Sequence, residues 1–291
     1  MLKLSWASNI GSCSSNEDNL LFCGSGLREA CLPLEHRIDS GKRLLLSDAP
    51  LLCALADGLG GEDEGGQAAR TALLRLSEAY EEAAPEHTRL LSEICTLPPE
   101  ASTEDSFICV EEAEAAAPLP EVQLSQPPAS RLYQASQEAA AAVCQYYRQS
   151  GGTGGCTLAA AVVEPQGSTA RVVYTAAGDS CIFHFHHGSI RSVNLPENLF
   201  EEHRRRALPA HPLERGVLLN YLGHGHEKFQ TGEFTLTQGD RLLICSDGVC
   251  FGSAALRLLI SCRWIDAEKL TSLAVGHSTH SDNASALLID F

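Results

Sequence analysis

Long hydrophobic runs are missing from this sequence of 291 residues. Nowhere do about eighteen apolar residues follow one another, which argues against a membrane-spanning helix. The amino-terminal residues also lack the continuous apolar segment of a secretory signal peptide. We therefore expect a soluble, cytoplasmic protein that does not insert into a membrane.

Basic residues are scarce as well. Lys and Arg together number 21 against 37 Asp and Glu, so the formal net charge is −16. A chain of this charge repels the phosphate backbone of nucleic acids, and it suits cations or basic partners instead. The composition therefore excludes nucleic acid as an expected partner.

Cysteine is plentiful, but the spacings that bind zinc are absent. None of the 12 cysteines forms a Cys-x-x-Cys pair, and the nearest spacing, Cys245 to Cys250, has no matching second pair. A chain of this length can build its own core without disulfides, and no export signal is present. We expect free thiols rather than six disulfides or a structural zinc site on cysteines.

The apolar residues are numerous enough, at 44% of the chain, to fill a sizeable core. The continuous apolar run 51–56 predicts a buried strand, and the spacing of apolar residues over 65–84 predicts an amphipathic helix. A second helix is predicted at 131–149, and two more at 253–261 and 266–276. Further strands are predicted at residues 2–8, 19–23, 157–163, 170–177, 181–186, 190–193, 233–236, 241–245 and 284–291.

These elements predict an α+β fold, because helices interrupt blocks of strands instead of alternating with them. We expect a four-layer α/β/β/α sandwich, with two antiparallel sheets packed on each other and helices outside, as one domain over residues 1–291. Residues 85–130 hold seven of the 13 prolines and nine acidic residues against one arginine, which is typical of a mobile insertion. Residues 194–232 form a polar, partly helical excursion.

Acidic residues stand where apolar strands end or begin: Glu17, Asp18, Asp57, Asp179, Asp247 and Asp282. Taken singly, an Asp-Gly pair at a strand end is more often a turn than a ligand. Taken together, carboxylates converging at one edge of a sandwich would repel one another unless cations neutralised them. Oxygen-rich groups of this kind select hard ions such as Mg²⁺ or Mn²⁺.

Six short motifs together resemble the type 2C metal-dependent serine/threonine protein phosphatases. In chain order they are Asn-Glu-Asp at 16–18, Ala-Asp-Gly-Leu-Gly-Gly at 56–61, Gly-Cys-Thr-Leu at 155–158, Ala-Gly-Asp-Ser at 177–180, Gly-Asp-Arg-Leu-Leu-Ile-Cys-Ser-Asp-Gly at 239–248 and Ser-Asp-Asn at 281–283. The resemblance covers nearly the whole chain apart from residues 85–130. Leu59 in the second motif makes the chain similar to the bacterial branch of the family, which usually has Met there.

The resemblance implies the same sandwich fold and assigns roles at the acidic positions. Asp18 and Asp57 would be the catalytic residues, with Asp18 orienting a water bound between two Mn²⁺ or Mg²⁺ ions. The metal ligands would be Glu17, Asp57, the Gly58 carbonyl, Asp247 and Asp282, with Asp179 at the position of a third ion. Residues 194–232 would be the flap that borders the site in bacterial members.

The implied function is hydrolysis of phosphoserine and phosphothreonine in proteins by a metal-bridged water, reversing a Ser/Thr kinase. Two ions can activate the water and hold both the entering and leaving oxygens, so no protein nucleophile is required. The alternative is a pseudophosphatase that binds a partner without hydrolysis. Cys13 and Cys181 favour this alternative, because many family members carry Arg at these two positions.

Two further groups of residues each leave a choice open. The run Arg204, Arg205 and Arg206 is either a solvated helix face or a substrate contact that compensates for Cys13. His184 and His186 share one face of a predicted strand and could chelate a transition metal, although histidines at hairpin ends are usually solvated.

Overall fold

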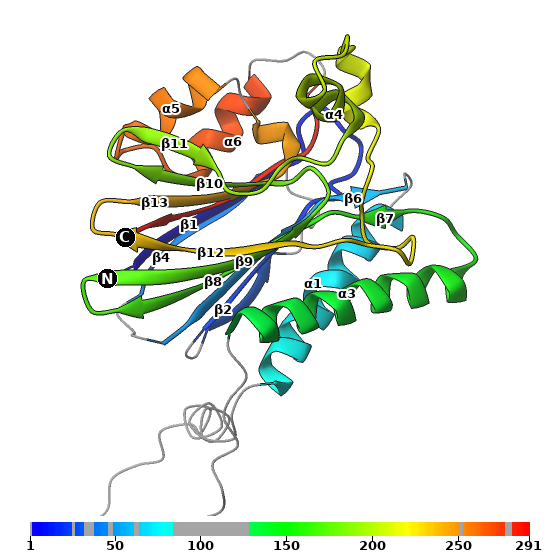
Figure 1. Cartoon of the computed structure of the whole chain (residues 1–291), viewed down its shortest axis with the longest axis horizontal. Coiled ribbons are helices and arrows are strands. Elements are labelled where there is room, and N and C mark those ends of the chain that lie inside the picture. The colour runs from blue at the N-terminus through cyan, green and yellow to red at the C-terminus, as the bar shows by residue number, and fades with distance from the viewer. Residues whose placement is uncertain are drawn as a thin grey trace, which may run out of the picture.

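The structure is a computed structural model of the chain, and it describes residues 2–24, 27–31, 38–45, 49–60, 64–83, 128–250, 253–276 and 281–291. Two antiparallel sheets lie face to face, with helices on both outer sides (Figure 1). The predicted insertion at 85–130 lies outside the described residues except for its last three positions, which begin a helix.

Each sheet has six strands in the described part of the chain. The first sheet, in spatial order, consists of β11 (Ser189–Ser192), β10 (Cys181–His186), β13 (Arg241–Cys245), β14 (Ala284–Asp290), β1 (Leu2–Asn9) and β4 (Ile38–Leu45). The second consists of β12 (Gln230–Thr237), β9 (Thr169–Ala177), β8 (Leu158–Gln166), β5 (Leu51–Ala56), β2 (Asn19–Gly24) and β3 (Leu27–Cys31). A short pair, β6 (Gly58–Leu59) with β7 (Gly155–Cys156), extends from the second sheet's end.

The space between the sheets is filled by large apolar side chains. Every residue of β5 is buried, as its continuous apolar run predicts for a strand covered on both faces. Trp6 of β1 packs against Phe22 of β2 with ring centroids 4.6 Å apart. Gly41 of β4 leaves room for the indole, since a Cβ atom there would lie 2.2 Å from Trp6 Cζ2. Burying side chains of this size is worth about 1.5–3 kcal/mol each.

Helices cover both outer faces of the sandwich and complete the four predicted layers. The helices α1 (Glu64–Glu82) and α3 (Pro128–Ser150) lie on the second sheet, where small residues such as Ala72 and Ala139 let them pack closely. The helices α5 (Ser253–Ser261) and α6 (Ala267–Gly276) lie on the first sheet (Figure 1). The predicted α+β sandwich is therefore confirmed.

Several element boundaries differ from the predictions. The strands β3 and β4 were not predicted, because apolar and polar residues do not alternate in their sequences. Among the described strands, both lie at the edges of their sheets, where alternation is weakly enforced. The helix α3 begins at Pro128 rather than at residue 131, since proline is tolerated in the first helical turn.

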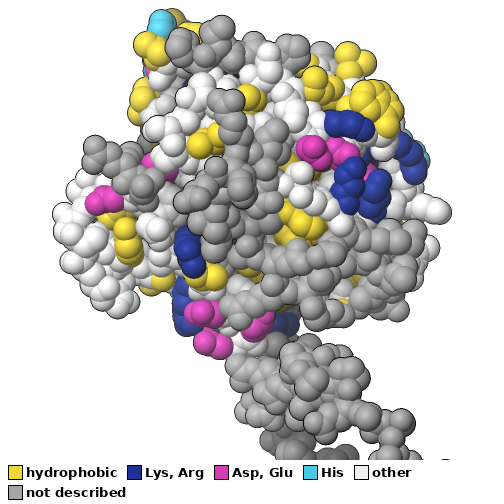
Figure 2. Space-filling view, turned by 180° about the vertical axis from the view of Figure 1, so that it is seen from behind, with side chains coloured by type: hydrophobic (Ala, Val, Ile, Leu, Met, Phe, Trp, Pro, Cys, Tyr) yellow, Lys and Arg dark blue, Asp and Glu magenta, His cyan; other side chains and the backbone are white. Residues whose placement is uncertain are grey.

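The surface carries mixed charges where the structure describes it. On the face shown in Figure 2, Lys and Arg side chains lie beside Asp and Glu side chains instead of gathering into one basic area. Lys42 and Asp266, for example, form an ion pair of 2.5 Å. Among the described helices, none is both long enough and apolar enough to cross a membrane.

Candidate metal centre

The acidic residues singled out in the sequence come together at one end of the sandwich. Asp18 precedes β2 and Asp57 follows β5, and these two strands are antiparallel neighbours. Asp247 follows β13 and Asp282 precedes β14, which are likewise antiparallel neighbours in the other sheet. An antiparallel pair places the end of one strand beside the start of the next, so all four carboxylates reach the same edge.

Asp18 is the most deeply enclosed of these residues, with no exposed surface. Its Oδ2 accepts a hydrogen bond of 2.8 Å from the Ser246 hydroxyl, whereas its Oδ1 has no partner among the described residues. Burial, together with the negative charge of Asp282, raises the pKa of Asp18 to about 6. The hydroxyls of Ser246 and Ser285 oppose this rise by stabilising the carboxylate.

Asp57 is fixed through its backbone by the neighbouring strand. Its N–H donates to Thr157 Oγ1 over 3.0 Å, and its carbonyl accepts from the Thr157 N–H over 2.8 Å. Burial, followed by the charges of Asp18 and Asp247, holds the pKa of the Asp57 carboxyl well above its usual range. The pKa of Asp57 is therefore influenced by four other carboxylates of the acidic group, Asp18, Asp247, Asp179 and Asp282.

Gly58 and Glu17 lie against the first turn of α1. A Cβ atom on Gly58 would be 2.3 Å from the backbone carbon of Gly65, so only glycine fits beside this helix. Glu17 Oε2 lies over the same turn, where a Cβ atom on Gly65 would approach it to 2.4 Å. The positive end of the helix dipole favours a carboxylate at this place.

Asp247 and Asp179 occupy the side of the centre that faces the predicted flap. Burial, with the charges of Asp179 and Asp282, holds the pKa of Asp247 well above its usual range. Asp179 Oδ2 accepts a hydrogen bond of 3.1 Å from Asn198, and burial raises the pKa of Asp179 to about 6. Both carboxyls are therefore costly to ionise in the folded protein without a nearby cation.

Asn283 joins the three chain segments that meet at the centre. Its Oδ1 accepts from the Glu17 N–H over 2.8 Å, and its Nδ2 donates to the carbonyls of Ile10 and Ser15 over 3.0 and 3.1 Å. Its own N–H donates to Asp282 Oδ1 over 2.8 Å. This amide therefore fixes the position of Glu17 relative to Asp282.

The residues present fit divalent cations of the hard class. The donors are carboxylate oxygens, one buried oxygen lacks a described partner, and burial together with mutual repulsion raises the pKa values of Asp18, Asp57 and Asp247. In the described residues, one group of three His, Cys, Asp or Glu side chains has all its ligand atoms within 4.8 Å of each other, and it lies elsewhere in the molecule. The carboxylates are thus spread over more space than a single ion occupies.

Sequence reasoning missed the polar residues that hold the carboxylates in place, among them Thr157, Ser246, Ser285 and Asn198. All four are buried, and each contacts another buried polar group. In the sequence, Thr157, Ser246 and Ser285 are hydroxyl residues at the ends of apolar strands, and such a residue is easily interpreted as part of a turn. Only the fold shows which acidic side chain each of them reaches.

The two cysteines at positions where the family often has Arg differ in their surroundings. Cys13 is exposed, and its Sγ lies 3.7 Å from Asp282 Oδ1, at the mouth of the centre. Cys181 is buried beneath the centre, and its Sγ lies 3.4 Å from that of Cys250. Of these two positions, therefore, only residue 13 is placed to reach a phosphate at the carboxylates.

The segment 194–232 borders the centre and contains the helix α4 (Leu199–Arg205) and the short 3-10 helix η1 (Pro212–Gly216). Asn198 caps α4 by accepting from the Glu201 N–H over 3.0 Å, while its Nδ2 donates to Asp179. Glu197 accepts from the Gly178 N–H over 3.0 Å and from Asn220 Nδ2 over 2.6 Å. The segment is therefore anchored on both sides of Asp179.

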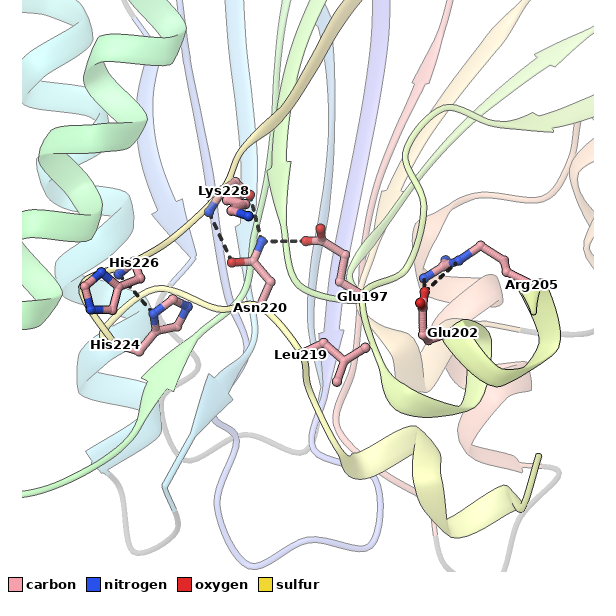
Figure 3. A pocket seen from close by; sticks show the side chains of 8 residues that line it. All are labelled: Glu197, Glu202, Arg205, Leu219, Asn220, His224, His226 and Lys228. Carbon is pink, nitrogen blue, oxygen red and sulfur yellow. Dashed lines mark hydrogen bonds and ion pairs between the residues drawn. The ribbon is translucent and has the colours of Figure 1, made fainter. Parts of the chain in front are cut away.

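A pocket of about 310 Å³ opens within this segment (Figure 3). It is lined by Glu197, Glu202, Arg205, Leu219, Asn220, His224, His226 and Lys228. Figure 3 shows Arg205 and Glu202 on α4 at one side, the two histidines at the other, and Glu197 with Asn220 between them. The pocket adjoins the strand end that carries Asp179, because Glu197 in its lining accepts a hydrogen bond from the Gly178 N–H.

The three consecutive arginines at the end of α4, Arg204, Arg205 and the following residue Arg206, are each paired with a glutamate of this helix. Arg204 contacts Glu201 over 3.0 Å, while Arg205 and Arg206 contact Glu202 over 2.8 and 2.6 Å. Of the three, only Arg205 lines the pocket. The two outer arginines are more exposed, with about two thirds of each side chain accessible, at 62% and 68%.

Comparisons with known proteins agree with this geometry. The family model of protein phosphatase 2C matches residues 39–267. The chain belongs to the protein phosphatase 2C family. It is a metal-dependent serine/threonine protein phosphatase, as the resemblance of its six motifs implied.

Solved structures of bacterial phosphatases share the fold over almost their whole length. The phosphatase MsPP from Mycobacterium smegmatis, in complex with cacodylate, has 19% identity and a TM-score of 0.63, with 99% of this chain and 97% of that chain covered. The catalytic domain of PstP, in complex with two manganese ions, has 16% identity and a TM-score of 0.64, with 100% and 99% covered. The serine/threonine phosphatase of S. agalactiae has 17% identity and a TM-score of 0.67, with 100% and 99% covered. A search of curated protein sequences finds no significant match.

Proposed function

We propose that two Mn²⁺ or Mg²⁺ ions bind at this centre and that phosphoserine and phosphothreonine side chains of proteins are hydrolysed there. The observation that carries the proposal is the convergence of carboxylates from both sheets, with raised pKa values and one buried oxygen without a described partner. The PstP catalytic domain, which has the same fold, was solved with two manganese ions. The proposal therefore rests on two supports, the carboxylate donors of this chain and its membership of the protein phosphatase 2C family.

The ligands are proposed as the resemblance assigned them. Asp57 would contact both ions, and burial and the charges of Asp18 and Asp247 act on its carboxyl. Glu17 and the Gly58 carbonyl would hold one ion, and Asp247 with Asp282 would hold the other. Asp179, which is tied to the flap through Asn198, is proposed as a ligand of a third ion.

When bound, divalent ions supply positive charge that holds phosphate oxygens and lowers the pKa of a water molecule. The contribution of Asp18 is orientation. Ser246 fixes Oδ2, so Oδ1 is the oxygen that accepts a hydrogen bond from the attacking water. A fixed acceptor aligns the water for in-line attack on phosphorus, which lowers the entropic cost of the reaction.

Substrate recognition is proposed to involve the arginines of the flap. Arg205 lines the pocket beside the centre, and its guanidinium is held by Glu202 and by the carbonyl of Pro196 over 3.0 Å. Arg204 and Arg206 extend on the exposed side of α4, where they would contact residues further along a phosphorylated protein. These contacts would compensate in part for the missing arginine at Cys13.

The biological partners are proposed from the reaction. A phosphatase of this class reverses the action of a Ser/Thr kinase, so a cognate kinase and its phosphorylated substrates are the expected partners in signalling. Several cysteines of the described residues, among them Cys13, Cys181 and Cys250, are free thiols, which suits the reducing conditions of the cytoplasm. We therefore place the enzyme in the cytoplasm.

The test is hydrolysis of a phosphothreonine peptide by the purified protein with Mn²⁺, with EDTA, and in the variants Asp57→Asn and Asp247→Asn. We expect phosphate release that requires Mn²⁺ and falls at least about a hundredfold in both variants, as when electrostatic stabilisation is removed from a transition state. Asp266→Asn is the matched control, because this carboxylate lies at the start of α6 and contacts Lys42. Measured Mn²⁺ binding without phosphate release would contradict the proposal and favour a partner-binding protein.

A further inference from the structure

A second cluster of metal-binding side chains lies at the opposite end of the sandwich. His184 and His186 are near the end of β10, and Asp240 directly precedes β13. The β10 to β11 and β12 to β13 turns lie at the end of the molecule that carries both termini, whereas α4 lies at the other end (Figure 1). This cluster is therefore separate from the carboxylates of the phosphatase centre.

The geometry of the cluster is compact. His184 Nε2 lies 3.1 Å from Asp240 Oδ2, and His186 Nδ1 lies 2.7 Å from Asp240 Oδ1. One ligand atom from each of the three residues falls within 4.8 Å of the other two. The two histidines alternate on β10, so both rings are on the same face of the sheet.

The surrounding residues hold the cluster in place. The Asp240 side chain is 1% exposed, and its Oδ2 accepts from the N–H and the hydroxyl of Thr237 over 2.8 and 3.1 Å. The His184 ring stacks on Phe234 with centroids 4.8 Å apart and is 11% exposed. His186 is more accessible, at 47%, and provides the open side through which an ion can enter.

We propose that His184, His186 and Asp240 bind one Zn²⁺ ion. Two imidazole nitrogens and one carboxylate oxygen are a ligand set that zinc accepts in tetrahedral geometry, with a fourth position left for water or another residue. His187 is next to the cluster, with its ring centroid 4.1 Å from that of His186. The contacts of Thr237 to Asp240 are of the kind that orients a metal-binding carboxylate.

The nitrogen donors of this cluster also select a different kind of metal ion from the carboxylates of the phosphatase centre. Imidazole suits zinc and related transition metals, whereas carboxylate and carbonyl oxygens suit Mg²⁺ and Mn²⁺. The proposal therefore does not depend on the proposed catalytic function.

The expected role of this ion is structural. Strand β10 belongs to the first sheet, while Asp240 follows the turn that leads out of β12 in the second sheet. An ion bound to both would join β10 to the connection between β12 and β13, at the end distant from the active site. Since it binds the folded state only, zinc at about a hundred times its dissociation constant should raise the melting temperature by about 5 °C.

The test compares the whole protein with His186→Ala and Asp240→Asn. Each protein is dialysed against Zn²⁺ with excess Mg²⁺, and bound zinc is measured by elemental analysis. We expect each of these two variants to hold one equivalent less zinc than the unchanged protein. Zinc should raise the melting temperature of the unchanged protein but not that of the two variants. The matched control is His226→Ala, which removes a histidine of the flap pocket and should lose no zinc from the cluster.

Circular dichroism shows whether each variant folds. If a variant does not fold, a second measurement on the unchanged protein still tests the proposal. Co²⁺ added to the unchanged protein should give the intense visible absorption of a four-coordinate site, whereas a six-coordinate oxygen site absorbs weakly. Equal zinc content in all folded proteins, or no four-coordinate Co²⁺ signal in the unchanged protein, would overturn the proposal.

Discussion

The hydroxyl of Ser246 donates a 2.8 Å hydrogen bond to Oδ2 of Asp18, although the two residues are 228 positions apart in the chain. The same hydroxyl accepts the N–H of Ser285 over 2.9 Å. The side chain of Ser246, which follows β13, therefore connects the start of β2 with the start of β14. It also supplies a hydrogen bond that favours the ionised form of a buried carboxyl.

We expect Ser246→Ala to raise the pKa of Asp18 further above about 6, because the carboxylate would lose a hydrogen bond while remaining buried. Such a bond to a charged group is worth about 1.5–3 kcal/mol, or about one to two pKa units, so the ionised fraction of Asp18 and with it phosphatase activity near pH 7 should fall about two- to tenfold. The measurement is kcat/KM against pH, whose acidic limb should move to higher pH. Ser261→Ala, at the exposed end of α5, is the control and should keep the original profile. An unchanged profile in Ser246→Ala would argue against this role.

Gly248 has no space for a side chain, because a Cβ atom there would lie 2.0 Å from the carbonyl oxygen of Asn283. Both residues adjoin proposed metal ligands, so Gly248→Ala must displace Asp247 or Asp282. We expect a loss of stability of about 1–3 kcal/mol, as for other overpacked sites, and weaker Mn²⁺ binding. Thermal unfolding and calorimetric Mn²⁺ titration measure the two effects.

Gly216→Ala is the matched control for this substitution. A Cβ atom on Gly216 would meet nothing within 4 Å, so neither the melting temperature nor Mn²⁺ affinity should change. If Gly248→Ala bound Mn²⁺ as tightly as the Gly216 variant, the close contact between Gly248 and Asn283 would not fix the position of a metal ligand.

Much of the fold follows from the sequence because its inner strands are continuous apolar runs. Strand β5 was predicted as residues 51–56 and is observed at Leu51–Ala56, since a strand buried on both faces leaves a clear pattern. The strands β3 and β4 leave no such pattern, because among the described strands they lie at the edges of their sheets. Hydrogen-bond pairing across a sheet carries little sequence signal.

The candidate site, like the fold, could be predicted only in part from the sequence. The acidic residues could be predicted because carboxylates at strand ends are conspicuous when several occur together. The residues that hold these carboxylates in place could not be predicted, since Asn283 reaches Ile10 and Glu17 only after β1 and β14 have paired. The arginines at 204–206 also needed the structure, because only the fold shows that Arg205 lines the pocket while Arg204 and Arg206 are largely exposed.

Cys13 offers a test of how strongly phosphate is held. Its Sγ lies 3.7 Å from Asp282 Oδ1 at the exposed mouth of the centre, where a longer cationic side chain has room to reach a bound phosphate. We expect Cys13→Arg to lower KM for a phosphothreonine peptide about tenfold, the value of a charge-assisted contact. Cys13→Ser is the control, because it removes the thiol without adding charge. Equal KM values in the two variants would show that residue 13 does not contact the substrate.

The pKa values of Asp18 and Asp179 predict how stability depends on pH and on metal. Both stand at about 6 in the folded protein against an ordinary value of 3.8, because burial penalises the ionised form. Above about pH 6 both groups are ionised in the metal-free fold at a cost of up to about 3 kcal/mol each. As pH falls from 6 towards 4, the folded state takes up protons before the unfolded state does, so this cost disappears.

Divalent cations offset the same cost by neutralising the carboxylates, and protons compete with them. The difference in unfolding free energy between Mn²⁺-loaded and metal-free protein should therefore increase as pH rises from about 4.5 to 7. Urea unfolding across this range, with and without Mn²⁺, measures it. Asp179→Asn removes one of the two titrating groups, so in this variant metal-free stability should vary less with pH. A stabilisation by Mn²⁺ that is the same at every pH would show that these buried carboxyls are not where the ions bind.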